Sequence, residues 1–392
     1  MGRPLKSPPA LADLDTYRAR LLAHGFDTYA EAWNWTLRPT VRAAIEAARG
    51  EAEAADQRGR SPALAHIGGR EWTVAPHGAA GGVRHVLRDD RFMVHLRAEG
   101  CEWGISIRYL SRGLWEAGGL DARRAEIMDW LEGVADPADD DAETAEPVLS
   151  RFDYAFDFHS PAFSSEAGPA LEERFLVPAH TKGCRWWQGD RTQTITLGLM
   201  PRLQVQVYDK GAEIVQASGK DWMGELWQAA AGEPLRGDDG AFRDVWRIEL
   251  RFGGEYLKER KIRGYGAMRS RLPEMLSAAL VDRRLTVDDP RRVDLRPMHP
   301  LWWRAWEAAG RATTAPPVVR YTSLQRQEYR DLLVTQLAGT LRSGAVAEGG
   351  KWSDEAAEQI AADALRLAQS DPLGPAKEKA ARGRFRWLGE LD

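Results

Sequence analysis

The sequence predicts an α+β fold, with a mainly antiparallel central sheet that carries the candidate active site and helical regions at both ends of the chain. Three strand-like segments with charged residues at alternate positions indicate the sheet, and stretches with helical apolar spacing before and after them indicate the helices. The segments that join the three strands are long enough to hold a helix. Strands with interspersed helices in this order are typical of the α+β class.

The three charged segments, residues 151–157, 204–210 and 246–252, are the most informative feature of the chain. Side chains alternate between the two faces of a strand, so every second residue of a segment shares a face. Charged side chains are costly to remove from water unless they pair or bind a ligand, so the charged face is the candidate active site. That face collects Arg151, Asp153, Asp157, Gln206, Tyr208, Lys210, Arg247, Glu249 and Arg251.

The first third of the chain is expected to pass from helix to strand and back. Residues 11–58 are predicted to be helical because they include Ala- and Glu-rich stretches with apolar spacing. Residues 83–87 and 92–97 form an extended pair, and the alternation in 103–109 predicts a half-buried strand. A helix is expected from Asp121, as its cap, to about residue 134.

Loops, a hairpin and helices are expected after residue 135. Segment 136–147 holds six acids and no base, and is expected to be a mobile loop or linker. Residues 193–197 and 203–208 are predicted to form a hairpin, and 220–231 a helix. Further helices are expected at 267–282, 300–309, 323–342 and 354–369.

Composition limits the function classes. The 392 residues, 43% apolar and 29% charged, indicate a soluble globular protein. No apolar run approaches the roughly 20 residues of a membrane span, and two cysteines without metal-type spacing favour the cytoplasm. The elements divide the chain into an N-terminal helical region (1–62), a catalytic α+β domain (63–310) and a C-terminal helical region with a basic tail (311–392).

The charge distribution leaves room for a basic surface. The net charge of −4 argues weakly against nucleic-acid binding, but the acidic segment 136–147 accounts for it and the rest of the chain is slightly positive. Basic clusters lie at 258–263 and 377–386. A mildly acidic total therefore allows a locally basic groove.

Tyr208 and Lys210 lie two positions apart and so share a face. A phenol has an ordinary pKa near ~10, and a neighbouring ammonium would lower this pKa and make the oxygen a better nucleophile. Tyr154 lies on the opposite face and is expected in the core. A tyrosine at the end of a strand is more often structural than nucleophilic, and alternating charges often form surface ion-pair ladders. Both interpretations stay open on physical grounds.

The carboxylates and arginines of this face suit phosphodiester chemistry. Asp153, Asp157 and Glu249 are hard oxygen ligands that suit Mg²⁺ or Mn²⁺. Arg247 can grip a phosphate in bidentate fashion. Nucleophile, metal ligands and phosphate clamp together favour transesterification onto tyrosine. His159 follows Asp157 by two positions and is an additional candidate, although a histidine at a strand end is more often a surface residue.

The ordered set R-F-D-Y-A-F-D, Q-V-Q-V-Y-D-K-G-A-E and W-R-I-E-L-R-F-G-G-E-Y-L resembles the replication initiation factor family. That family comprises rolling-circle initiators of small plasmids and filamentous phages and related relaxases of conjugative elements. Residues 105–118 are similar to the strand that precedes the first motif, and the resemblance covers roughly residues 80–310. Its members nick one DNA strand at an origin with a tyrosine, stay attached to the 5′ phosphate and leave a 3′ hydroxyl.

The resemblance implies a role for each matching residue. Tyr208 would be the nucleophile, Lys210 its basic neighbour and Arg247 a support for phosphate. Asp153, Asp157 and Glu249 would be metal or acid–base carboxylates, with Glu213 a weaker addition. None of the eight histidines shows His-x-His spacing, so the expected Mg²⁺ or Mn²⁺ is held by carboxylates. The residues expected to bind DNA are Arg251, Lys258, Arg260, Lys261 and Arg263.

The expected partners are single-stranded or hairpin origin DNA and, in a homodimer, a second copy of the chain; no membrane partner is expected. Residues 217–221 lack the pattern of an ATP-binding phosphate loop, so unwinding is assigned to a separate helicase. Three alternatives stay open: a relaxase with the same chemistry, a non-catalytic origin-binding protein, and a nuclease that activates water at a metal.

Overall fold

The computed structural model describes residues 17–57, 63–98, 100–138, 146–178, 183–188, 191–232, 234–238, 240–312, 334, 337–338, 341–346 and 351–370. In residues 169, 184–188, 191 and 192 it describes the backbone only. Within this part of the chain, no helix is both long and apolar enough to cross a membrane.

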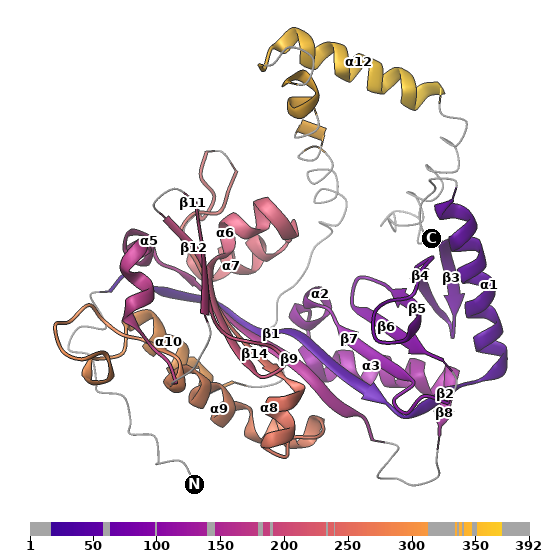
Figure 1. Ribbon diagram of the computed structural model, residues 1–392, viewed down its shortest axis with the longest axis horizontal. Helices are drawn as coiled ribbons and strands as arrows, with labels where there is room; N and C mark the ends of the chain where they lie inside the picture. The colour runs from indigo at the N-terminus through magenta and orange to yellow at the C-terminus, as the bar shows by residue number, and fades with distance from the viewer. Residues whose placement is uncertain are drawn as a thin grey trace.

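One large sheet dominates the structure (Figure 1). It has 11 strands in the order β11-β12-β13-β14-β9-β1-β7-β6-β5-β4-β3, and every neighbouring pair is antiparallel. The predicted α+β class with a mainly antiparallel central sheet is confirmed. The strands are β1 (Arg20–Trp33), β3 (Ala63–Ile67), β4 (Arg70–Val74), β5 (Val83–Arg88), β6 (Phe92–Arg97), β7 (Ile105–Tyr109), β9 (Val148–His159), β11 (Gly183–Gln188), β12 (Arg191–Gly198), β13 (Leu203–Asp209) and β14 (Val245–Gly253).

Two short antiparallel pairs lie outside this sheet. β2 (Trp35–Leu37) pairs with β8 (Ala135–Pro137), and β10 (Phe175–Leu176) pairs with β15 (Arg284–Leu285). Because β8 includes residues 136 and 137, the predicted acidic loop is wrong at its start. Residues 139–145 lie outside the described part of the chain.

The apolar face of the sheet is covered by the larger helices. Phe152, Tyr154 and Phe156 of β9 are 0–1% exposed and belong to one large buried cluster. Helices that contribute to this cluster include α1 (Pro39–Asp56), α3 (Gly119–Val134), α8 (Gly254–Glu259), α9 (Tyr265–Asp282) and α10 (Pro300–Ala309).

The opposite face, which we call the site face, carries a second and smaller core. Ala23 and Ala155 of the sheet pack there with Trp115, Met223 and other residues of short helices. Figure 1 shows α6 and α7 on one side of the sheet and α9 and α10 on the other. The elements on or near the site face are α2 (Ser111–Trp115), α6 (Lys210–Glu213), the π-helical turn Ile214–Ser218 and α7 (Met223–Ala231).

Four further helical elements complete the described structure. They are α5 (Pro161–Glu166), the 3₁₀ turns Pro169–Arg174 and Val293–Leu295, and α12 (Asp354–Ser370). The helices predicted at 267–282, 300–309 and 354–369 are confirmed within one or two residues as α9, α10 and α12. Most of the helix predicted at 323–342, and the basic tail at 377–386, lie outside the described residues.

The predicted N-terminal helical region is wrong over residues 20–37. β1 fills residues 20–33 and lies inside the sheet, between β9 and β7, so this segment belongs to the central sheet. Three register shifts against β9 interrupt its alternation of buried and exposed residues. Such bulges hide the two-residue period that identifies a strand in a sequence. Only residues 39–56 are helical, as α1.

Candidate active site

The site is built on three neighbouring strands, β13, β14 and β9. Tyr208, Arg247 and Asp157 are directly opposite one another in the two ladders. Directly opposite residues of an antiparallel pair point to the same face. The shared charged face expected from the alternating sequence is therefore present, and Tyr154 lies in the core behind it with 1% exposure.

Arg247 is the centre of this face and is completely buried. Its Nε and Nη2 atoms donate to the two carboxylate oxygens of Asp157 at 2.6 and 2.8 Å. Its Nη1 donates to Oδ1 of Asp27, in β1, at 2.7 Å. Burial works against the charge of the guanidinium, but Asp157 outweighs this and raises the pKa of Arg247 well above its ordinary value. One guanidinium thus joins three strands of the sheet.

Both carboxylates of this cluster have further donors. Trp227 Nε1, from α7, donates to Oδ2 of Asp157 at 2.9 Å. Ser111 Oγ, from α2, donates to Oδ1 of Asp27 at 2.8 Å. Burial would raise the pKa of Asp27, but the positive charges of Lys220, Arg247 and Lys210 lower it below its ordinary value. The cluster is a charged, fully bonded core that positions the strands and the helices above them.

Tyr208 points toward Glu249. Its hydroxyl donates to Oε2 of Glu249 at 2.7 Å, and Arg251 Nε donates to Oε1 of the same carboxylate at 2.7 Å. Tyr208 is only 8% exposed. Burial, and then the charge of Glu249, raise the pKa of the phenol well above its ordinary value. The phenol is therefore protonated at neutral pH, and Glu249 is the group placed to accept its proton.

Lys210 does not activate Tyr208 in the expected way. Its Nζ donates to Oε2 of Glu213 at 2.5 Å and lies 5.5 Å from the centroid of the Tyr208 ring. Burial lowers the pKa of this ammonium. The expectation that Lys210 lowers the pKa of the phenol is wrong for this arrangement, because the ammonium faces Glu213 and the ring while burial dominates the phenol.

Asp153 completes the row of predicted carboxylates. Arg151 holds it in bidentate fashion, Nε to Oδ1 at 2.9 Å and Nη2 to Oδ2 at 2.6 Å. Burial raises the pKa of Asp153 to about 6, and the negative charge of Glu249 adds to this effect. The shift of Asp153 is opposite to that of Glu249, whose pKa is lowered.

The three predicted metal ligands do not fit a metal ion as they are arranged. Asp153, Asp157 and Glu249 each pair with an arginine at 2.6–2.7 Å. Within the described residues, no group of three or more His, Cys, Asp or Glu side chains is placed to hold a metal. His159 is half-buried at the end of β9, and Glu213 faces Lys210. A cation here would have to displace arginines, so the requirement for Mg²⁺ or Mn²⁺ stays a prediction.

Most of the predicted DNA-binding residues lie away from this site. Arg251 is part of it, with a side chain that is 25% exposed. The exposed residues Lys258, Arg260, Lys261 and Arg263 lie in and after α8, which packs on the apolar face. Gly253 lies six residues after Arg247 in β14, a distance of about 20 Å along the strand.

The sequence did not identify Asp27, Ser111 and Trp227 as site residues. Asp27 falls in the segment predicted to be helical, at one of the register shifts of β1. Ser111 and Trp227 reach the cluster from two helices that follow different strands. The one available signal was the pattern of the three strands, which leaves Arg247 with more hydrogen-bond donors than Asp157 alone can satisfy.

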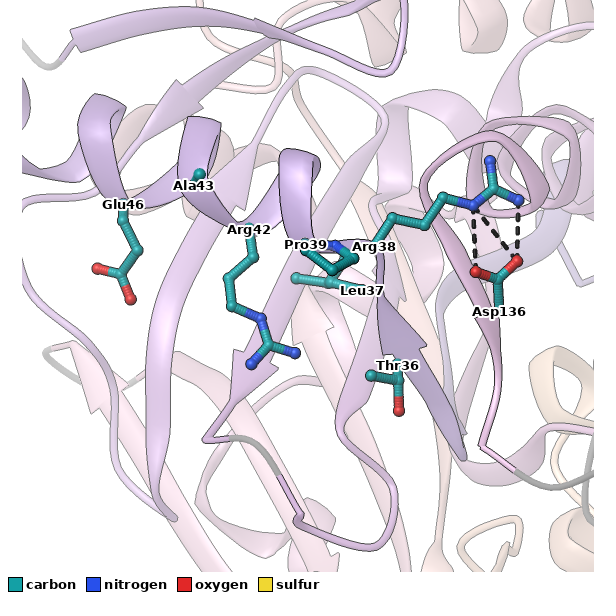
Figure 2. A pocket seen from close by; sticks show the side chains of 8 residues that line it. All are labelled: Thr36, Leu37, Arg38, Pro39, Arg42, Ala43, Glu46 and Asp136. Atoms are coloured by element: carbon teal, nitrogen blue, oxygen red, sulfur yellow. Dashed lines mark hydrogen bonds and ion pairs between the residues drawn. The ribbon is translucent and has the colours of Figure 1, made fainter.

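A cavity of about 560 Å³ lies elsewhere, between β2 and the start of α1 (Figure 2). Arg38 at its edge bonds Asp136 in bidentate fashion, with Nη2 to Oδ1 at 2.9 Å. None of the residues predicted to form the active site lines this cavity.

Comparisons with known proteins give a structural likeness. No family model matches the chain, and no curated protein matches it. A solved structure of a rolling circle replication initiator protein from Geobacillus stearothermophilus is similar over 76% of this chain and 98% of its own, with a TM-score of 0.41 and 11% identity. A likeness at this level does not assign an activity to the chain.

Proposed function

We propose that the chain is a rolling-circle replication initiator that nicks one DNA strand at an origin through Tyr208. The observation that carries the proposal is the hydrogen bond from the Tyr208 hydroxyl to Glu249 at 2.7 Å, on a sheet face that also holds Arg251 and Arg247. A nucleophile bonded to a base that a third group orients is the arrangement that nucleophilic catalysis uses. The motif order of the three strands supports the same reaction.

In the proposed step, Tyr208 Oη forms a bond to the phosphorus while the bond from phosphorus to the 3′ oxygen breaks. The phenolic proton passes to Glu249, and the leaving 3′ oxygen takes up a proton from water to become a hydroxyl. The strand is left with a 5′-phosphotyrosine link and a free 3′ end. Arg251 keeps Glu249 charged, because its guanidinium outweighs the effect of burial and lowers the pKa of that carboxyl.

Arg247, Asp157 and Asp27 are assigned a positioning role. All three are at most 8% exposed and Arg247 bonds both aspartates, so they fix the register of β14, β9 and β1 behind the tyrosine. Preorganised groups of this kind hold a nucleophile in the geometry that the reaction needs.

The first test replaces the nucleophilic oxygen alone. Tyr208→Phe keeps the ring, so we expect it to form no covalent adduct with labelled single-stranded origin DNA while equilibrium binding stays within about twofold of wild type. Tyr154→Phe is the matched control, because its hydroxyl bonds His24 Nδ1 on the apolar face, and it should form the adduct. An adduct in the Tyr208→Phe variant would overturn the assignment.

A cation requirement stays a prediction from the sequence, because a cation would have to displace the arginines that pair with the carboxylates. We expect nicking by the wild type to need Mg²⁺ or Mn²⁺ and to stop when EDTA is in excess. Undiminished nicking in EDTA would dismiss the metal and leave the arginine-paired arrangement as the working site.

The burial of Tyr208 favours one rival, a non-catalytic DNA-binding protein. With 8% exposure and a raised pKa, the phenol can be reached by a phosphate only if neighbouring side chains move. The rival predicts DNA binding without any adduct in the wild type, under all conditions that support binding.

A further inference from the structure

Three arginines form one row across the open half of the large sheet. Arg88 of β5 is opposite Met93 of β6, which is opposite Arg108 of β7. Arg108 is opposite Ala30 of β1, which in turn is opposite Arg151 of β9. Directly opposite residues share a face, so the three guanidinium groups project from the site face. We call Arg88, Arg108 and Arg151 the basic row.

The residues between these arginines add no charge to the row. Met93 and Ala30, which separate them, are uncharged. Neighbouring strands lie about 4.8 Å apart, so successive arginines of the row are about 10 Å apart and the row spans about 19 Å. The spacing is regular because each arginine is separated from the next by a single intervening strand.

Two of the three arginines are unpaired. Arg88 and Arg108 are exposed, and within the described residues neither side chain forms a hydrogen bond or an ion pair. Arg151 is 29% exposed and pairs with Asp153. Burial, and then the charge of Arg151, lower the pKa of Arg108, and the negative charge of Asp153 opposes this effect. The exposed charges of Arg88 and Arg108 have no ion-pair partner in the described part of the chain, and a polyanion on that face would supply one.

The open face contrasts with the covered part of the sheet. At the level of Arg247 the site face lies under α2 and α7, whereas along β5, β6 and β7 its side chains are half-buried or exposed. The same strands bury their other face fully, since Leu87, Val94 and Ile107 are 0% exposed. The basic row is therefore a solvent-facing surface of the sheet that also carries the candidate active site.

We propose that the basic row binds the phosphate backbone of a single DNA strand and leads it toward Tyr208. The direction toward Tyr208 rests on the proposed function. Charge complementarity selects a polyanion. From Arg151 the site face continues past Arg251 and Gln204 to Tyr208, about 20 Å along the strands. Separated positive charges that lead to a mostly buried tyrosine suit a single strand, because it is thinner and more flexible than a duplex.

The test removes the two unpaired arginines together. Arg88→Gln with Arg108→Gln should fold normally, because neither side chain has a partner to lose. Binding of a labelled oligothymidylate of about 16 nucleotides is measured by fluorescence anisotropy over a salt series. Each phosphate contact on a single strand contributes about 0.7 to the log–log salt slope, so the slope should become shallower by about 1.4. At 0.1 M salt this corresponds to about 25-fold weaker binding.

The matched control is Arg291→Gln with Arg292→Gln. These side chains are 56% and 78% exposed, lie in the loop before α10 and carry the same total charge. We expect this variant to keep the wild-type slope and affinity.

The outcomes separate this proposal from the proposed function. An unchanged slope in the Arg88/Arg108 variant overturns the basic row as a DNA surface. Weaker binding to duplex DNA with unchanged binding to the oligothymidylate overturns the assignment to a single strand. Because the readout is equilibrium binding, it does not depend on nicking. If the adduct test at Tyr208 fails, the basic row remains a proposed DNA surface. Only the proposal that it leads the strand toward Tyr208 is then lost.

Discussion

At the scale of single residues, pairing determines what each charged side chain can do. Glu249 accepts one hydrogen bond from Tyr208 and one from Arg251, and it has lost its contact with water. Its pKa is lowered while that of Tyr208 is raised, so at neutral pH the pair holds a charged base and a protonated nucleophile. In the proposed reaction, these opposite shifts suit Glu249 as the base and Tyr208 as the nucleophile.

Removing the base should affect the rate and leave binding nearly intact. Glu249→Gln keeps an oxygen that can accept the hydroxyl proton of Tyr208 in a hydrogen bond but cannot take that proton. We expect nicking to fall by about 10²- to 10⁴-fold, the usual contribution of a general base. Single-turnover nicking of labelled origin DNA measures this, with Glu255→Gln on α8 as the control.

The pH profile distinguishes a base from a merely structural acid. A carboxylate with a lowered pKa is charged above that pKa, so wild-type nicking should persist into mildly acid solution and fall only as the pH drops through the pKa of Glu249. In Glu249→Gln this acid limb should be absent. An unchanged acid limb in the variant would show that another group takes the proton.

At the scale of elements, Arg247 fastens β14 to β9 and to β1. The side chains of Arg247 and Asp157 are fully buried, so water cannot take the place of either partner when the other is removed. Breaking a buried pair by removing one partner leaves an uncompensated charge and costs about 3–5 kcal/mol.

Asp157→Asn should therefore lower the free energy of unfolding by about 3–5 kcal/mol in urea titrations. Asp136→Asn is the matched control, because Arg38 holds Asp136 in the same bidentate geometry at the surface, with side chains 42% and 62% exposed. Exposed pairs contribute little, so the control should lose far less stability. Equal losses in the two variants would contradict the clamping role of Arg247.

The sequence predicted the elements with an uninterrupted period and missed those without one. β13 and β14 alternate regularly, and their common face could be derived from residue spacing alone. β1 contains three register shifts, and its sequence predicts a helix instead of a strand. Asp27 is therefore not identified as a site residue from the sequence. The partners of Arg247 come from β1, α2 and α7 as well as β9, and such long-range contacts leave no local pattern in a sequence.

At the scale of the whole molecule, the sheet has two differently covered halves on its site face. Helices close the half that holds Tyr208 and Arg247, and the half with Arg88 and Arg108 is open. A net charge of −4 therefore coexists with two exposed arginines without ion-pair partners among the described residues, on the same face of the sheet as the candidate nucleophile. Net charge alone did not reveal this surface, because the arginines of the row are far apart in the sequence.

The most direct measurement of the central claim is to locate the covalent bond. The wild-type protein is incubated with single-stranded origin DNA, digested with nuclease and protease, and its peptides are analysed by mass spectrometry for a residual phosphonucleotide. The account predicts one modified peptide, with the phosphate on Tyr208. A modification on another tyrosine, or none under conditions in which the DNA is nicked, would contradict it.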